Sequence, residues 1–254
     1  MDPGTLIGIA IAFGSIFLSM IMEGGNPVAL MKPPALILVF GGTFGAAMAG
    51  ALFKDAKAIV PRLKTALLAP KHPEHDVVEV VVKLAETARR EGLLALEDAI
   101  RTLDDPFLKE GLSLAVDGTD EEELRDILET KIQAERSQDI AASKFFSDMG
   151  GYAPTIGIIG TVIGLVHVLG NLSQPDKLGE LIAGAFIATL WGVLSANVLW
   201  LPMGAKLKRY ADVRALRQEL VVEGILAIQS GASPRVVEQK LRAHAPPAAE
   251  KKAA

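Results

Sequence analysis

Two threonines, Thr161 and Thr189, are the polar side chains whose surroundings most suggest chemistry, because both lie in long stretches without charge. Residues 149–175 and residues 181–205 contain no Asp, Glu, Lys or Arg. About 20 apolar residues are enough for a helix to cross the hydrocarbon core of a bilayer. We therefore predict that the two hydroxyl groups lie at matching depths in two membrane helices, where they could line an ion path.

The apolar stretches of this chain contain no acidic residue that would bind an ion. Ionisable side chains inside a membrane are costly and usually mark ion pathways, and here only His167 occurs, near the outer end of its helix. We interpret His167 as an interfacial residue rather than a proton relay. If the hydroxyl groups line an ion path, the carboxylate must come from another chain. The alternative is a packing seam between helices that conducts nothing.

The composition argues against several other kinds of site. The 254 residues carry a net charge of −4 and no cysteine, which argues against nucleic-acid binding, disulfides and thiolate metal sites. His72 and His75 flank Pro73 in a segment that we interpret as a loop rather than a metal site. No familiar catalytic motif occurs, so we predict neither an enzyme nor a permanently bound metal or cofactor.

The charge-free stretches divide the chain. Half of the residues are apolar and the mean hydropathy is +0.34, although 22% of the residues are charged, because the two kinds are segregated. We predict an all-α polytopic membrane protein with four transmembrane helices, at about residues 4–22, 34–53, 149–171 and 180–202. The predicted divisions are a transmembrane hairpin (1–53), a cytoplasmic helical domain (54–148), a second transmembrane hairpin (149–205), and C-terminal cytoplasmic helices with a disordered tail (206–254).

Small residues mark one face of each of the last two predicted spans. They are Gly157, Gly160 and Gly164 in the third span and Ala185, Gly192 and Ala196 in the fourth. In lipid, small side chains let helix backbones approach closely, so we predict that these faces pack against other helices. We further expect Pro202 to end the fourth span, and Trp191 and Trp200 to face lipid or the membrane interface.

The distribution of positive charge predicts the orientation in the membrane. Basic residues follow the second and the fourth spans: Lys54, Lys57, Arg62 and Lys64, and then Lys206, Lys208, Arg209, Arg214 and Arg217. The other two connections contain only Lys32 and Lys177. By the positive-inside rule both basic flanks are cytoplasmic, so both termini are predicted to be cytoplasmic as well.

The region between the two hairpins is predicted to be helical. Apolar residues recur there at helical spacing from Val77 onward, and Gly92 is typical of a helix end or bend. Thr119, with Glu122 three residues later, predicts a capping box. The helix that begins there is expected to run without a break into the third span.

Three segments of the chain resemble a known family. YAPTIGIIGTVIGLVHVLGNL, LGELIAGAFIATLWGVLSANVLWLPMGAKLK and ARREGLLALED are similar to the flagellar motor stator A subunits, the MotA/PomA branch of the MotA/TolQ/ExbB ion-channel family. The resemblance covers nearly the whole chain. It implies that five copies surround two copies of a MotB/PomB-like B subunit, whose single transmembrane helix carries the ion-binding aspartate. It also implies that ion flow in the bacterial inner membrane turns the ring, whose cytoplasmic rim pushes on the rotor switch complex.

The resemblance implies roles for four charged or conformational positions. Pro154 and Pro202 match family prolines at the cytoplasmic ends of the third and fourth helices, with a gating or conformational role. Arg89 and Glu97 match the charged pair that faces the rotor, and Arg90 is the alternative register for the arginine. If these residues have no functional role, the prolines only bend or end a membrane helix, and the charged residues only form salt bridges on an exposed helix face.

The resemblance also bears on the transported ion, which is Na⁺ or H⁺. Thr161 and Thr189 correspond to the threonines that line the ion path of the family. Sodium-driven members tend to have Thr at both positions, whereas many proton-driven members have Ala at the first. A hydroxyl oxygen is a suitable hard ligand for a partly dehydrated Na⁺, so this comparison favours Na⁺.

Two alternatives to a stator subunit remain at this point. A TolQ/ExbB-like energiser of outer-membrane processes usually has three spans, which fits poorly with the apolar hairpin within residues 1–53. A non-conducting membrane scaffold, whose cytoplasmic helices recruit partners, needs no ion path at all.

Overall fold

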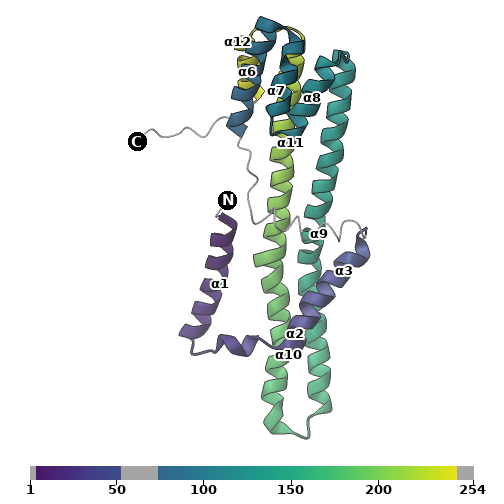
Figure 1. The fold of residues 1–254 in the computed structure, drawn as a ribbon. Helices are drawn as coiled ribbons and strands as arrows, with labels where there is room; N and C mark the ends of the chain where they lie inside the picture. Colours follow the sequence, from purple (N-terminus) through teal and green to yellow (C-terminus); the bar gives the residue numbers. More distant parts are fainter. Residues whose placement is uncertain (1–3, 53–73, 245–254) are drawn as a thin grey trace. The chain divides into compact units, whose positions relative to one another are not determined.

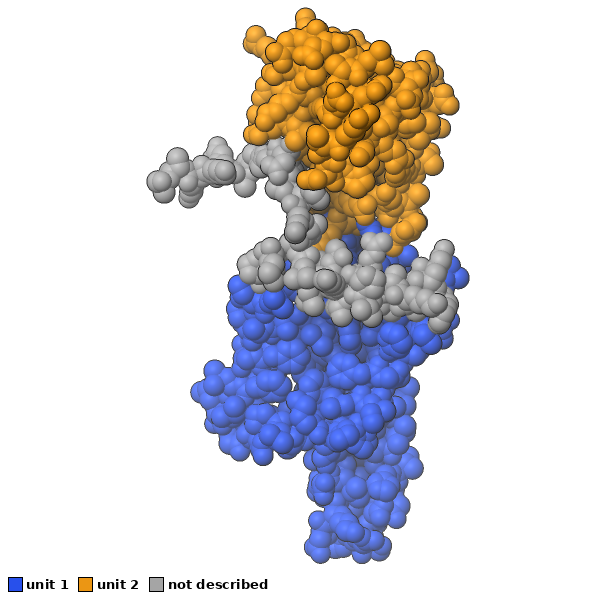
Figure 2. Space-filling model, viewed as in Figure 1, with its two compact units in different colours: residues 1–70, 139–209 blue, residues 71–138, 210–254 orange. Residues whose placement is uncertain are grey.

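The computed structural model describes residues 4–52 and 74–244, and within these ranges every regular element is a helix. The prediction of an all-α protein is therefore confirmed. The chain divides into two compact units (Figure 2): unit 1 contains residues 1–70 and 139–209, and unit 2 contains residues 71–138 and 210–254. The first predicted basic cluster, from Lys54 to Lys64, and the C-terminal tail both lie outside the described residues.

Within the described residues, four helices are long and apolar enough to cross a membrane, as the sequence predicts. The first is α1 (Gly4–Met22), and the second consists of α2 (Pro33–Leu36), the π-helical η2 (Ile37–Gly41) and α3 (Gly42–Gly50) (Figure 1). The third lies in α9 (Glu121–Gly170), and the fourth lies in α10 (Pro175–Ser195) and its continuation. The continuation of α10 consists of the π-helical η4 (Ala196–Trp200) and α11 (Leu201–Gln229). Helix α9 is unbroken over 50 residues, so the predicted entry of one long helix into the third span is confirmed.

The first two spans run in opposite directions but α1 makes its main contacts elsewhere in unit 1 (Figure 1). It contacts η4 and the short 3₁₀ helix η1 (Pro27–Leu30). The indole Nε1 of Trp191 donates to the Leu30 carbonyl oxygen at 2.8 Å and fixes η1 against α10. Trp191 is buried, so the expectation that it faces lipid or the interface was wrong. A buried indole needs a hydrogen-bond acceptor, and the loop carbonyl supplies it.

The helix that contains the fourth span does not stop at Pro202, the predicted end of that span. It lies in the first turn of α11, which continues to Gln229. Proline has no N–H and its ring crowds the carbonyl four residues earlier, which would normally break a helix. The π-helical turn η4 ends at Trp200, two residues before Pro202, and changes the hydrogen-bond register there. The chain therefore passes the proline as a helix.

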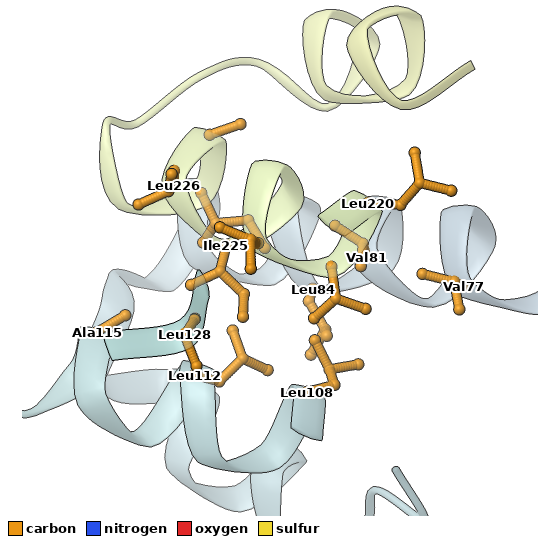
Figure 3. Packing of buried hydrophobic residues seen from close by; sticks show 14 of the residues in the cluster. Val77, Val81, Leu84, Leu108, Leu112, Ala115, Leu128, Leu220, Ile225 and Leu226 are labelled. Atoms are coloured by element: carbon orange, nitrogen blue, oxygen red, sulfur yellow. The ribbon is translucent and has the colours of Figure 1, made fainter. Parts of the chain in front are cut away.

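Unit 2 is a helical bundle around an aliphatic core. Its further helices are α6 (Glu74–Glu91), η3 (Leu93–Ala95), α7 (Leu96–Thr102), α8 (Pro106–Val116) and α12 (Pro234–His244). Leu112 and Leu128 are fully buried and face Ile225 of α11 (Figure 3). Burying each such side chain contributes about 1.5–3 kcal/mol. Helix α12 packs against α6, so the C-terminal helices, predicted as a separate segment, share one core with residues 74–138.

Local capping in unit 2 follows the sequence only in part. Gly92 has a φ of +86° and separates α6 from η3, as predicted. Helix α9 begins one residue later than predicted, because Asp120 rather than Thr119 caps it: Asp120 Oδ1 accepts from the N–H of Glu122 at 2.9 Å. His75 lies in the first turn of α6 and not in a loop, whereas His72 lies outside the described residues.

Candidate ion-path site

The structure brings Thr161 of α9 and Thr189 of α10 into direct contact. Their hydroxyl oxygens are 2.5 Å apart. The Thr161 hydroxyl is also 3.0 Å from the carbonyl oxygen of Ala185, and the Thr189 hydroxyl is 3.2 Å from that of Gly157. Both side chains are half-buried within the single chain.

Glycines are what allow α9 and α10 to approach closely enough for this contact. A Cβ atom on Gly157 would lie 2.8 Å from the carbonyl oxygen of Ala188, and one on Gly192 would lie 2.5 Å from that of Ala153. On Gly164 it would lie 2.6 Å from the Cβ of Ala185. None of these separations is tolerated, so the seam between the two helices depends on residues without side chains.

The two remaining small residues are also packed within unit 1. A Cβ on Gly160 would meet Ala188 Cβ at 2.6 Å and Leu38 Cδ2 at 2.8 Å, so Gly160 packs against both α10 and the second span. Ala196 is buried in η4. The sequence placed all six small residues on two faces. It did not indicate that Leu38 would complete the surroundings of α9.

The numbers of hydrogen-bond donors and acceptors around Thr161 and Thr189 determine what the two hydroxyl groups can bind. Each hydroxyl has one hydrogen, and the available acceptors are the partner hydroxyl and the carbonyls of Ala185 and Gly157. One hydroxyl therefore donates to the other and the second donates to a carbonyl, which leaves lone pairs on both oxygens unused. Hard oxygen donors of this kind suit a partly dehydrated cation. Residues 149–175 and 181–205 supply no carboxylate to complete such a site.

The two prolines of interest lie at different positions relative to this pair. Pro154 is inside α9, one turn before Gly157, and is half-buried. It removes the hydrogen bond that the Gly150 carbonyl would otherwise accept, which makes this turn the weak point of a long helix. Pro202 lies farther along the fourth span, after η4.

The charged residues expected at the rotor belong to unit 2. Arg89 and Arg90 are at the end of α6, and Glu97 is in the first turn of α7. All three side chains are exposed, and none forms an ion pair with another described residue. Gly92 and η3 turn the chain between them. We call these three side chains the charged rim.

Sequence reasoning missed several contacts that hold unit 1 in shape. Lys32 Nζ is 3.2 Å from Glu180 Oε1, which links the start of α2 to the start of α10. The ring of Phe40 lies 6.0 Å from Trp191 and 6.0 Å from Trp200. Each contact joins residues far apart in sequence, so no local spacing signals it. For the aromatic contacts, the only hint was the presence of these rings in two charge-free stretches.

Unit 2 also contains a pocket of about 240 Å³ between α9 and α11, which is not connected with the predicted sites. Arg125 lines it and pairs with Glu223 at 2.8 Å and with Glu129 at 3.3 Å. The hydrogen bond to Glu223 raises the pKa of Arg125 above its usual value. The guanidinium is therefore charged at every accessible pH and provides no pH switch here.

These features describe an all-helical membrane protein whose polar seam contains no acidic residue, and comparisons with known proteins show the family to which it belongs. Residues 6–92 match the family described as Motility protein A N-terminal, and residues 99–219 match the MotA/TolQ/ExbB proton channel family. The chain belongs to the MotA/TolQ/ExbB proton channel family, as its resemblance implied.

Individual relatives place the chain near the motility branch. It is 39% identical to Motility protein A of Bacillus subtilis over 97% of this chain and 92% of that protein. It is 31% identical to Chemotaxis protein PomA of Vibrio alginolyticus over 95% of this chain and 94% of that protein. The match to the N-terminal motility family covers the first two spans, which favours a stator subunit over the energiser alternative.

Solved structures show the same fold. The structure of C. jejuni MotAB superposes with a TM-score of 0.93 at 31% identity, covering 98% of this chain and 97% of that chain. The flagellar MotAB stator complex from Bacillus subtilis superposes with a TM-score of 0.88 at 37% identity, covering 95% of each chain. The predicted fold class is thus confirmed over nearly the full length.

Proposed function

We propose that this chain is the A-type subunit of a bacterial flagellar stator, which couples ion flow through the membrane to torque on the rotor. The observation that carries the proposal is the pair formed by Thr161 and Thr189, whose hydroxyls meet in a helix seam without any acid. If this seam lines an ion path, the titrating or ion-binding group must come from another chain. The similarity to two complexes named MotAB supports a B-type partner as its source.

The proposed assembly is a ring of five copies around two B-type helices, each with an ion-binding aspartate. Helix α1 supports an assembly of several chains or a lipid contact, because none of its residues is buried within the single chain. The outer face of α9 is apolar and exposed as well, for example at Ile159, Val162 and Val166. In water such faces would be unstable, whereas lipid or neighbouring subunits can cover them.

The proposed ion is Na⁺, with H⁺ as the alternative. The argument is that two adjacent hydroxyl oxygens with unused lone pairs are useful to a metal cation. A proton moving to an aspartate on the partner helix needs no such oxygens. No permanent metal, other cofactor or catalytic reaction is part of the proposal.

The charged rim is the proposed contact with the rotor switch complex. Exposed charges that have no partner among residues 4–52 and 74–244 are available to pair with opposite charges on another protein. Such pairs steer an encounter and fix its register more than they add to its affinity. That is suitable for a contact that must form and release as the ring turns.

The proposed location is the bacterial inner membrane, with both termini in the cytoplasm. The support is the basic flank that follows the fourth span, including Lys206, Lys208 and Arg209. Unit 2 and the charged rim are then cytoplasmic, where a rotor protein can reach them.

The proposal is tested by expressing the chain with its B-type partner in a motile bacterium whose own stator genes are deleted. We expect swimming to be restored only when both chains are present. Replacing Na⁺ by K⁺ should stop swimming, whereas a protonophore should have little effect. A chain that inserts into the membrane and forms a ring with its partner, yet restores no swimming, would support the scaffold alternative instead.

A further inference from the structure

The ion pair between Asp105 and Arg217 in unit 2 is unusual for its burial. Arg217 Nη2 lies 2.5 Å from Asp105 Oδ2, and the two side chains are only 16% and 13% exposed. By comparison, the pairs Arg125–Glu223, Arg136–Asp212 and Arg214–Glu135 each have one partner that is more than 40% exposed. Desolvating both charges costs several kcal/mol, so a buried pair adds little net stability and is better explained by a positioning role.

Asp105 connects two elements at once. Its Oδ1 accepts hydrogen bonds from the N–H groups of Phe107 at 2.9 Å and Leu108 at 3.2 Å, and so caps the start of α8. Its Oδ2 faces Arg217 of α11. The carboxylate therefore fixes the beginning of α8 and ties it to α11, the helix that continues from the fourth span.

The segment directly before Asp105 carries part of the charged rim. Helix α7 contains Glu97 in its first turn, is seven residues long, and has no side-chain hydrogen bond at its N-cap. A helix this short has no stability of its own. It depends on Leu96 and Ile100, which are buried in the core, and on the short link that ends at Asp105.

The two kinds of support differ in direction. Apolar packing is non-directional and holds α7 to the core through Leu96 and Ile100. Attraction between two opposite charges in a buried site is strong and weakens as they move apart. A sideways push on Glu97 loads the short link from α7 to Asp105, and the ion pair with Arg217 adds a directional contact that opposes movement of this link.

We propose that Asp105 and Arg217 are positioning residues for torque generation, which hold α7 and its rim charge in place against α11 when the rotor pushes back. This inference rests on the proposed stator function. It predicts that weakening the pair lowers the torque of each stator unit, even where the number of units in the motor is unchanged.

The test uses the full chain with its B-type partner in stator-deleted cells, with a bead attached to a flagellar filament. At high load, the rotation speed rises in steps as single stator units join the motor. The height of a step measures the torque of one unit, and the number of steps measures how many units assemble. The variants are Asp105→Asn, which keeps a good N-cap for α8, and Arg217→Lys, which keeps the charge. Arg214→Gln is the matched control, because it removes the more exposed pair with Glu135 from the same helix.

We expect Asp105→Asn to reduce the step height by about twofold or more, Arg217→Lys to reduce it less, and Arg214→Gln to leave it unchanged. Normal step height with fewer steps would show that the pair only supports folding or assembly, and would overturn the inference. Absence of steps with the unmodified chain would instead refute the stator function itself. If a variant gives no steps, amide hydrogen exchange of the purified complex decides: faster exchange confined to residues 96–102 supports the inference, and unchanged or global exchange overturns it.

Discussion

The seam between α9 and α10 in unit 1 and the core of unit 2 both contain glycines at close helix contacts, but what opposes those glycines differs. In the seam, a Cβ on Gly192 would meet a backbone oxygen, that of Ala153, at 2.5 Å. In unit 2, a Cβ on Gly111 would meet the end of a flexible side chain, Ile225 Cδ1, also at 2.5 Å. The distances are equal and the physical consequences are not.

A side chain can rotate away from a new methyl group, whereas a helix backbone cannot. The core of unit 2 is therefore adaptable, as expected of large aliphatic residues driven together by the hydrophobic effect. The seam is fixed in geometry, because in lipid the association of helices depends on close packing. Rigid placement suits the seam, since the contact between the Thr161 and Thr189 hydroxyls depends on it.

The largest expected effect comes from a methyl group added to the seam. Gly192→Ala should separate α9 from α10 and abolish swimming, and the thermal midpoint of the purified complex should fall by several degrees. Overpacking typically costs about 1–3 kcal/mol, and an immovable backbone places this site at the upper end. Gly14→Ala is the control, because a Cβ there has no neighbour within 4 Å in the chain.

The comparison itself is tested by making the same change in unit 2. Gly111→Ala should lower the thermal midpoint less than Gly192→Ala and should leave swimming largely intact. Equal losses at the two glycines would show that the nature of the opposing atom does not matter.

The next effect concerns the charged rim, which lies in the adaptable unit and is exposed. Arg89→Glu combined with Glu97→Lys should strongly impair swimming while membrane insertion and ring assembly stay normal. Exposed substitutions of this kind usually change the free energy of unfolding by less than about 0.5 kcal/mol. Normal swimming of the double variant would remove the rotor-contact assignment.

A smaller and ion-dependent effect is expected inside the seam. Thr161→Ala removes one of the two hydroxyl oxygens and should lower torque most at low Na⁺ concentration. The control is Thr155→Ala in the same helix, whose hydroxyl lies 2.8 Å from the Tyr152 carbonyl oxygen. If Thr161→Ala swims like the unmodified chain at every Na⁺ concentration, the preference for Na⁺ is wrong.

The smallest effect tests local capping in unit 2. Asp120→Ala should destabilise the start of α9 by about 1 kcal/mol, because it removes the N-cap acceptor. Thr119→Ala should have little effect, since the Thr119 side chain is not the cap. Hydrogen exchange of residues 121–124 in the full chain measures both. Equal protection in the two variants would contradict the assignment of Asp120 as the cap.

The spans and the long helix could be predicted from the sequence because their signals are local. Charge-free stretches define membrane helices by length alone, and α9 contains no Gly–Pro turn that would interrupt it. Matching depths for Thr161 and Thr189 also followed from local position. Their direct contact did not, since it depends on how closely two helices approach.

The remaining features depend on contacts between distant residues. Trp191 is buried because Leu30, in a connecting segment, offers its carbonyl. Pro202 is accommodated because η4 changes the hydrogen-bond register before it. The pairing of Asp105 with Arg217 has no signature in the sequence, where Arg217 is one of several basic residues that follow a span.

The central claim is that this chain forms the acid-free wall of an ion path whose carboxylate comes from a partner helix. The direct measurement is cation flux into vesicles that contain the purified chain alone, its complex with the B-type partner, or the complex in which the partner's aspartate is changed to asparagine. We expect flux above that of empty vesicles only for the complex with the intact aspartate. Cation flux through the chain alone would contradict the claim.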